Sequence, residues 1–149
     1  MAKTQGTSYT KTQLKQWLKS LTRPRKKLDG LPICPFLARY EDRIHLAQNN
    51  EPEKLCRHFA DVKDIFRLEA CVVYGFRMTW DTMERMVSRL NRDLKHRDVC
   101  CFMMHPDGDE SVLPVEYQPP IPLLIIQRIS TLNKAKQQLS KTNYYKHYK

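Results

Sequence analysis

Apolar residues recur at helical spacing in three segments of the chain, residues 10–23, 50–66 and 79–95. A spacing of three and four residues places these side chains on one face, which can pack against the rest of the protein. Each segment is therefore predicted to form an amphipathic helix. Asn50 followed by Glu53 has the pattern of a capping box at the start of the second helix, and Thr79 is expected to cap the third.

Residues 70–76 and 99–105 form two short, almost continuous apolar runs. Such runs are typical of strands that are buried on both faces. Residues 43–47 can form a further strand. Residues 121–129 are apolar enough for an edge strand or for a buried helix turn, and periodicity does not separate these two alternatives. A last helix is predicted over about residues 130–139.

Strands that alternate with helices favour parallel pairing through right-handed crossovers, and 149 residues suit one domain. We therefore expect a single small α/β domain with a mostly parallel sheet of three or four strands, flanked by helices and carrying basic extensions at both ends. The expected divisions are a basic arm and amphipathic helix over residues 1–28, an α/β core over 29–129, and a basic helix and tail over 130–149.

The formal net charge of +10 is concentrated at the two ends of the chain. Residues 1–28 contain eight lysines and arginines and no acidic residue, residues 122–149 contain six and none, and the middle carries a net charge of −4. Basic ends of this kind suit polyanions such as nucleic acid, acidic protein surfaces or anionic lipid headgroups, and they equally keep a small protein in solution. The candidate polyanion-binding residues are Lys11, Lys15, Lys19, Arg23, Arg25, Lys26, Lys27, Lys141, Lys146 and Lys149.

Four aromatic residues, Trp17, Tyr144, Tyr145 and Tyr148, lie among these basic residues. This mixture suits phosphate contact combined with base stacking, although tyrosines in a tail equally suit a protein partner. The amphipathic basic helix of residues 10–23 can dock on its own domain, on a partner or on a membrane surface. Its apolar stripe is short, so we expect it to dock on its own domain.

Several classes of protein are disfavoured by what the sequence lacks. No apolar run approaches the 18 or so residues of a membrane span, and the N-terminus has no apolar signal segment, so a cytoplasmic location is expected. Five cysteines without a CxxC pair indicate a reduced protein. Glycines are too scattered for a phosphate loop, so no cofactor is expected. Cys101 and His105 share a strand face about 13 Å apart, too far for one zinc ion, so no metal is expected either.

Cys34 occupies an unusual position between Pro32 and Pro35. A short helix over residues 36–40 would place its thiol at a helix N-cap, where the N–H groups and the helix dipole favour the reactive thiolate. A thiol enzyme would then use Cys34 as nucleophile, His105 as base and Asp107 to orient the imidazole. The favoured alternatives are that Cys34 plugs the core and that His105 is an ordinary histidine at a strand end.

Several short elements follow one another along the chain: Trp17-Leu18, Cys34-Pro35-Phe36, His105-Pro106-Asp107, Pro120-Ile121-Pro122-Leu123-Leu124 and Arg128. In these elements and their order, the chain resembles a family of uncharacterised bacterial proteins with a Leu-Cys-Pro-Phe-Ala signature. The resemblance implies an α/β domain in which Cys34, His105, Asp107 and the segment 120–122 can meet, and it supplies no activity. Leu37 in place of the signature alanine and the basic C-terminal extension depart from the pattern.

Two functions from different classes follow from these features. The first is a non-enzymatic binding or assembly module that engages nucleic acid or an acidic protein partner through its basic ends. The second is a cysteine-dependent enzyme or redox protein built on Cys34 and His105. The sequence leaves the oligomeric state open.

Overall fold

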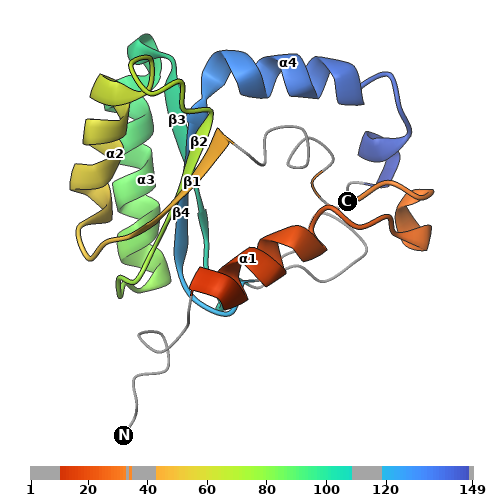
Figure 1. The fold of residues 1–149 in the computed structure, drawn as a ribbon, viewed down its shortest axis with the longest axis horizontal. Helices are drawn as coiled ribbons and strands as arrows, with labels where there is room; N and C mark the ends of the chain where they lie inside the picture. Colours follow the sequence, from red (N-terminus) through yellow and green to blue (C-terminus); the bar gives the residue numbers. More distant parts are fainter. Residues whose placement is uncertain (1–10, 33, 35–42, 109–118, 148–149) are drawn as a thin grey trace, which may run out of the picture.

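The computed structural model describes residues 11–32, 34, 43–108 and 119–147 (Figure 1). Helices form where apolar residues recur at helical spacing, and strands form in the apolar runs. In chain order the elements are α1 (Lys11–Ser20), the 3-10 helix η2 (Lys26–Leu28), β1 (Ile44–Gln48), α2 (Pro52–Val62), β2 (Ala70–Tyr74), α3 (Trp80–Leu94), the 3-10 helix η4 (Lys95–Arg97), β3 (Val99–Met104), β4 (Leu123–Arg128), α4 (Ile129–Leu139) and the 3-10 helix η5 (Tyr144–His147).

The four strands form one mixed sheet in the order β1-β2-β4-β3. β1 pairs with β2 in parallel, whereas β4 runs antiparallel to both of its neighbours, β2 and β3. The α/β class is confirmed, but the expectation of a mostly parallel sheet is not matched because β4 inserts between two strands of the opposite direction. Residues 121–129 thus contribute a central strand, which is neither an edge strand nor a helix turn.

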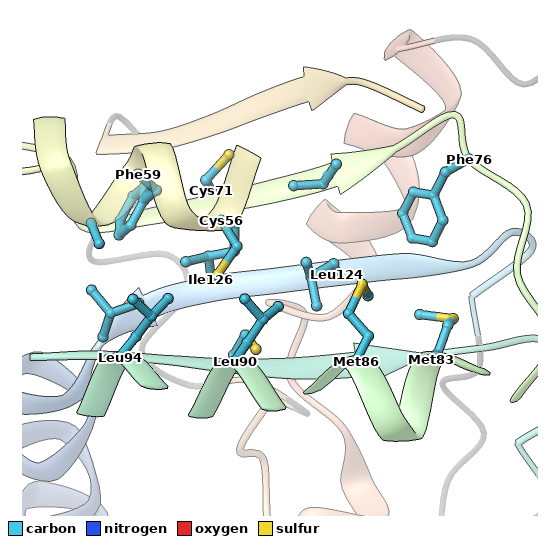
Figure 2. Close-up of a cluster of buried hydrophobic side chains, with 14 residues drawn as sticks. Cys56, Phe59, Cys71, Phe76, Met83, Met86, Leu90, Leu94, Leu124 and Ile126 are labelled. Atoms are coloured by element: carbon cyan, nitrogen blue, oxygen red, sulfur yellow. The ribbon is translucent and has the colours of Figure 1, made fainter. Parts of the chain in front are cut away.

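α2 and α3 cover one face of this sheet, and α1 and α4 lie on the other side, where α4 extends away from the end of the sheet (Figure 1). Side chains alternate along a strand, so β2 turns Cys71 and Val73 toward α2 and α3, and Val72 and Tyr74 toward α1. The main core lies under α2 and α3. Figure 2 shows α3 facing β4 through Met83, Met86, Leu90, Leu94, Leu124 and Ile126.

The sequence predicted the cap of α3 correctly and the cap of α2 wrongly. Thr79 caps α3 as expected, since its hydroxyl accepts a hydrogen bond from the backbone N–H of Thr82 at 3.3 Å. The predicted capping box of α2 does not form, because the helix begins later, at Pro52, and Asn49 accepts the N–H of Glu51 instead. The side chain of Glu53 is left to pair with arginines of α2 and α3.

The described parts of the two basic ends are packed and do not project as extensions. Leu14 of α1 is fully buried against Val72 and Tyr74, which confirms that α1 docks on its own domain. The end of α1, η2, the end of α4 and η5 meet in a second group of buried side chains, which we call the terminal cluster. It consists of Leu21, Leu28, Leu139 and Tyr144. No helix among the described residues has the length and apolar character needed to span a membrane.

Candidate functional site

Cys34 lies in an apolar environment at the edge of the terminal cluster. Its side chain is half-buried and packs against this cluster, and its backbone N–H donates to the carbonyl oxygen of Leu21 at 2.9 Å. The helix predicted over residues 36–40 lies outside the described residues. In the part that is described, Cys34 therefore has the packing expected of a plug.

His105 is buried and both of its ring nitrogens are engaged by the backbone. Nε2 donates to the carbonyl oxygen of Met78 at 3.0 Å, and Nδ1 accepts the N–H of Asp107 at 3.0 Å. These two bonds require the neutral imidazole with its proton on Nε2. The ring of Trp80 meets the imidazole edge-on at 6.2 Å between centroids. The nitrogen that a general base would use is thus already occupied by a main-chain donor.

The structure gives no support to the proposed catalytic group. Cys34 packs with the terminal cluster, His105 joins the end of β3 to the start of α3, and the carboxylate of Asp107 is exposed. That carboxylate lies 3.7 Å from Nδ1 of His105 and would form an ion pair with the imidazole only if the imidazole were protonated. The interactions of His105 instead stabilise the corner that follows β3.

Three other cysteines, Cys56, Cys71 and Cys101, are buried in the main core. Burial raises the pKa of Cys71 to about 12, and the contact with Cys56 together with burial raises the pKa of Cys101. Cys100 points to the other face of the sheet, as its neighbour position predicts, and burial raises its pKa to about 11. With these raised pKa values, the thiols of Cys71, Cys100 and Cys101 stay neutral near pH 7 and are poor nucleophiles. Among the described residues, no three histidine, cysteine or acidic side chains are placed to hold a metal ion.

The charged groups of the two sides of the sheet are organised differently. On the side of α2 and α3, acidic and basic residues pair: Glu53 with Arg89 at 2.8 Å, Arg57 with Asp93 at 3.0 Å, and a further pair joins Asp61 to Arg97. On the other side, no ion pair within the described part of the chain involves a lysine of α1, of η2 or of residues 129–147. The lysines concerned are Lys11, Lys15, Lys19, Lys26, Lys27, Lys134, Lys136, Lys141 and Lys146, all exposed.

Two of the expected binding residues have structural roles instead. The guanidinium of Arg25 is partly buried and donates to the carbonyl oxygen of Ser20 at 3.0 Å, which satisfies the end of α1. Tyr144 is buried in the terminal cluster and has no free face for a base. Lys149 and Tyr148 lie outside the described residues. Arg23 and the lysines named above remain available to a ligand.

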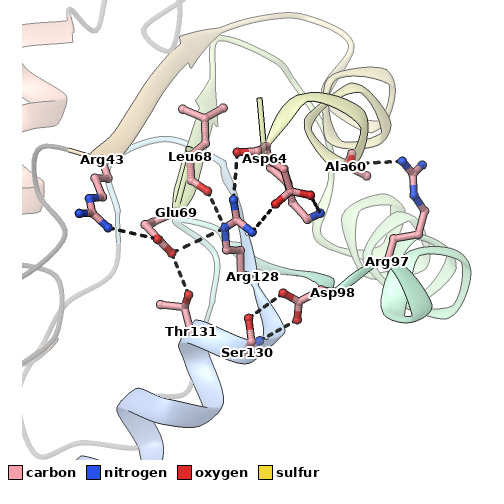
Figure 3. A network of polar contacts seen from close by, with 11 residues as sticks. Arg43, Ala60, Asp64, Leu68, Glu69, Arg97, Asp98, Arg128, Ser130 and Thr131 are labelled. Atoms are coloured by element: carbon pink, nitrogen blue, oxygen red, sulfur yellow. Dashed lines mark hydrogen bonds and ion pairs between the residues drawn. The ribbon is translucent and has the colours of Figure 1, made fainter. Parts of the chain in front are cut away.

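Arg128, at the end of β4, organises a second polar region that sequence reasoning did not recognise as a site (Figure 3). Its guanidinium donates to the carbonyl oxygens of Lys63 and Leu68 at 2.9 and 2.8 Å and to the carboxylate of Asp64 at 2.7 Å. Hydrogen bonds from Arg128 and Lys63 lower the pKa of Asp64. Glu69 lies 3.7 Å from the same guanidinium. These contacts tie the loop between α2 and β2 to β4.

A cavity of about 700 Å³ opens beside this network, between the start of β1 and the loop between α2 and β2. Phe66 lines it and is 66% exposed. Helical spacing places Phe66 on the buried face of the second helix, but α2 ends at Val62, so Phe66 belongs to the loop. In the sequence, the feature that could have indicated a binding site here is the pair Phe66-Arg67, an aromatic residue followed by a basic one.

Comparison with known proteins found no matching protein family, no matching curated protein and no matching solved structure.

Proposed function

We propose that this protein is a non-enzymatic binding module that engages nucleic acid through its basic ends. The observation that supports the proposal most is the terminal cluster, which joins segments separated by more than 100 residues of sequence. Leu21 and Leu28 from one end pack with Leu139 and Tyr144 from the other. Two basic regions of the chain thereby meet at one group of buried side chains, which supports their use as a joint binding surface.

The charges around the terminal cluster suit a polyanion. Lys19, Lys26, Lys27, Lys141 and Lys146 flank its buried residues in the sequence and are exposed. Residues 11–28 and 122–147 contain no acidic residue, and Asp29 directly follows the first of these segments. Like charges that are held close together repel one another, and a bound phosphate backbone relieves this repulsion and releases its own counterions.

The remaining features fit the same proposal. On the side of α2 and α3, Glu53, Asp61 and Asp93 pair with arginines of the same side, which reduces the positive charge that this side offers to a polyanion. Five free cysteines suit a reducing compartment, and we place the activity in the cytoplasm. The hydrogen bonds of both His105 ring nitrogens to the main chain favour this proposal over the alternative of a thiol enzyme with His105 as its base.

Fluorescence anisotropy with a labelled single-stranded oligonucleotide of about 20 nucleotides tests the proposal. We expect binding that weakens steeply with salt, since each phosphate contact contributes about −0.7 to the slope of log K against log salt. The triple variant K19E/K26E/K141E should bind at least ten-fold more weakly and show a shallower slope.

The matched control is K54E/R85E/K95E, which makes the same change in net charge on the side of α2 and α3. All three of its positions are exposed, and none takes part in an ion pair with another described residue. We expect this control to retain most of the affinity. Equal losses in the two variants, or no binding by the wild-type protein at low salt, would contradict the proposal.

A further inference from the structure

The cavity beside Arg128 combines an exposed aromatic ring with basic groups. Arg43, His45, Phe66 and Arg67 line it, and its volume of about 700 Å³ lies within the range of small-molecule sites, about 300–1,000 Å³. Arg43 comes from the residue before β1, His45 from β1 itself, and the other two from the loop between α2 and β2. The groups that can bind a ligand therefore converge from separate parts of the chain.

One wall of the cavity is preorganised. The side chain of Arg128 is only 17% exposed and is held by the carbonyl oxygens of Lys63 and Leu68. Glu69 is fixed in turn, since it accepts a hydrogen bond from the hydroxyl of Thr131 at 2.8 Å (Figure 3). Glu69 and Asp64 together balance the charges of Arg128 and Arg43, so the net positive charge of the cavity comes from Arg67.

The rim of the cavity carries groups that the fold itself does not use. Phe66 is a large apolar side chain with two thirds of its surface exposed. Arg67 has a φ of 54°, in the left-handed region where a residue other than glycine is strained by about 1 kcal/mol or more. No hydrogen bond or ion pair joins its guanidinium to any residue that the structure describes. An exposed aromatic side chain and an unpaired cation thus lie next to each other at one opening.

We infer that this cavity holds one nucleotide of a single-stranded nucleic acid, with its base stacked on Phe66 and its phosphate bound by Arg43 and Arg67. The inference rests on the proposed function and adds to it the kind of nucleic acid. A base in a duplex is paired and stacked on its neighbours, so it cannot turn its face to Phe66. Single strands present unstacked bases, which favours them as the ligand.

The position of α4 supports a continuous path for such a strand. α4 follows Arg128 at the cavity and ends with Leu139 in the terminal cluster. Its 11 residues span about 16 Å at 1.5 Å per residue. Lys134 is exposed between these two ends, on the same side of α4 as Thr131, whose hydroxyl contacts Glu69 of the cavity. A strand of several nucleotides can therefore contact the basic ends and place one base in the cavity.

The test measures anisotropy of a labelled 15-nucleotide oligothymidine and of a labelled 15-base-pair duplex with three variants. F66A should bind the single strand about ten-fold more weakly, as expected for loss of one stacked base, with an unchanged salt slope and unchanged affinity for the duplex. R67Q should weaken binding of the single strand and reduce the salt slope by about 1. I65A is the control, because Ile65 is the exposed neighbour and does not line the cavity; it should bind within two-fold of wild type.

The outcomes separate this inference from the proposed function. If the wild-type protein binds the single strand and F66A binds it equally well, the cavity is not a base-binding site, while the basic ends retain their role. If F66A weakens single strand and duplex alike, stacking is also excluded. If the wild-type protein binds neither probe, both proposals fail. Phe66 is exposed, so F66A should melt at the wild-type temperature, which is checked in the same samples.

Discussion

Nε2 of His105 donates a hydrogen bond to the carbonyl oxygen of Met78, 27 residues earlier in the chain. This bond joins the end of β3 to the segment that leads into α3. Nδ1 of His105 accepts the N–H of Asp107, so one buried side chain satisfies two main-chain groups. A residue that the sequence offers as a catalytic base is in the structure a connection between two elements.

Replacing this histidine should therefore lower stability. H105A leaves the carbonyl of Met78 and the N–H of Asp107 without their partner, and we expect a loss of about 1–3 kcal/mol in the free energy of unfolding. Urea unfolding followed by circular dichroism measures it. D107A is the control, because its exposed side chain is not needed for the backbone bond; it should change stability by less than about 0.5 kcal/mol. Equal effects of the two substitutions would contradict this role.

The ion pairs of α2 and α3 predict a dependence of stability on acid. A hydrogen bond from Arg89, supported by Arg57, lowers the pKa of Glu53 from 4.5 to about 2. A carboxylate whose pKa is lower in the folded state stabilises the fold above its unfolded pKa and loses that contribution as the pH falls. The wild-type protein should therefore lose stability between about pH 4.5 and pH 2 through this group.

The variant E53Q isolates that contribution. At pH 7 it should be about 1 kcal/mol less stable than wild type, since the pairs are partly exposed and screened by solvent. The difference should shrink as the pH falls below about 4.5, and little of it should remain at about pH 2. Urea unfolding at about pH 7, 4 and 2 measures the difference, and a difference that stays constant with pH would exclude the ion pair as its origin.

The terminal cluster predicts that the two ends of the chain are coupled. Leu28 is fully buried there, so L28A should lower the free energy of unfolding by about 2–5 kcal/mol. It should also speed hydrogen exchange at the last turn of α4, where Leu139 packs against the same group. L31A, at a half-buried position beside the cluster, should have a smaller effect. Unchanged exchange in α4 for L28A would show that the ends fold independently.

The cysteines predict a pattern of alkylation. Cys56, Cys71 and Cys101 should remain unmodified by iodoacetamide in the native protein at pH 8, because they are buried and the pKa of Cys71 and of Cys101 is raised. Modification of Cys34 should come first, and Cys100, with a pKa of about 11, should follow only slowly. Mass spectrometry of digested samples measures each site. In urea all five should react, and rapid native modification of Cys71 would contradict the packing of the main core.

Local features of this protein were predictable from sequence alone. Helical spacing placed α1, α2 and α3, since a period of three and four residues is set by the geometry of one helix. Thr79 was identified as the cap of α3 because a helix cap depends only on nearby residues, here the backbone N–H of Thr82 three positions later. The contrast between basic ends and a mildly acidic middle is likewise a property of the sequence itself.

Long-range relationships were decided only by the tertiary structure. The apolar run that becomes β4 could occupy several positions in a sheet. Its place between β2 and β3 depends on hydrogen bonding to both of these strands and on burial of both of its faces. The exposure of Phe66 depends on where α2 ends, which the contacts of Arg128 with the following loop help to set. The meeting of the two basic ends depends on buried side chains from segments far apart in the chain. No local spacing encodes such contacts, because each is stabilised by burial that exists only once the whole domain has folded.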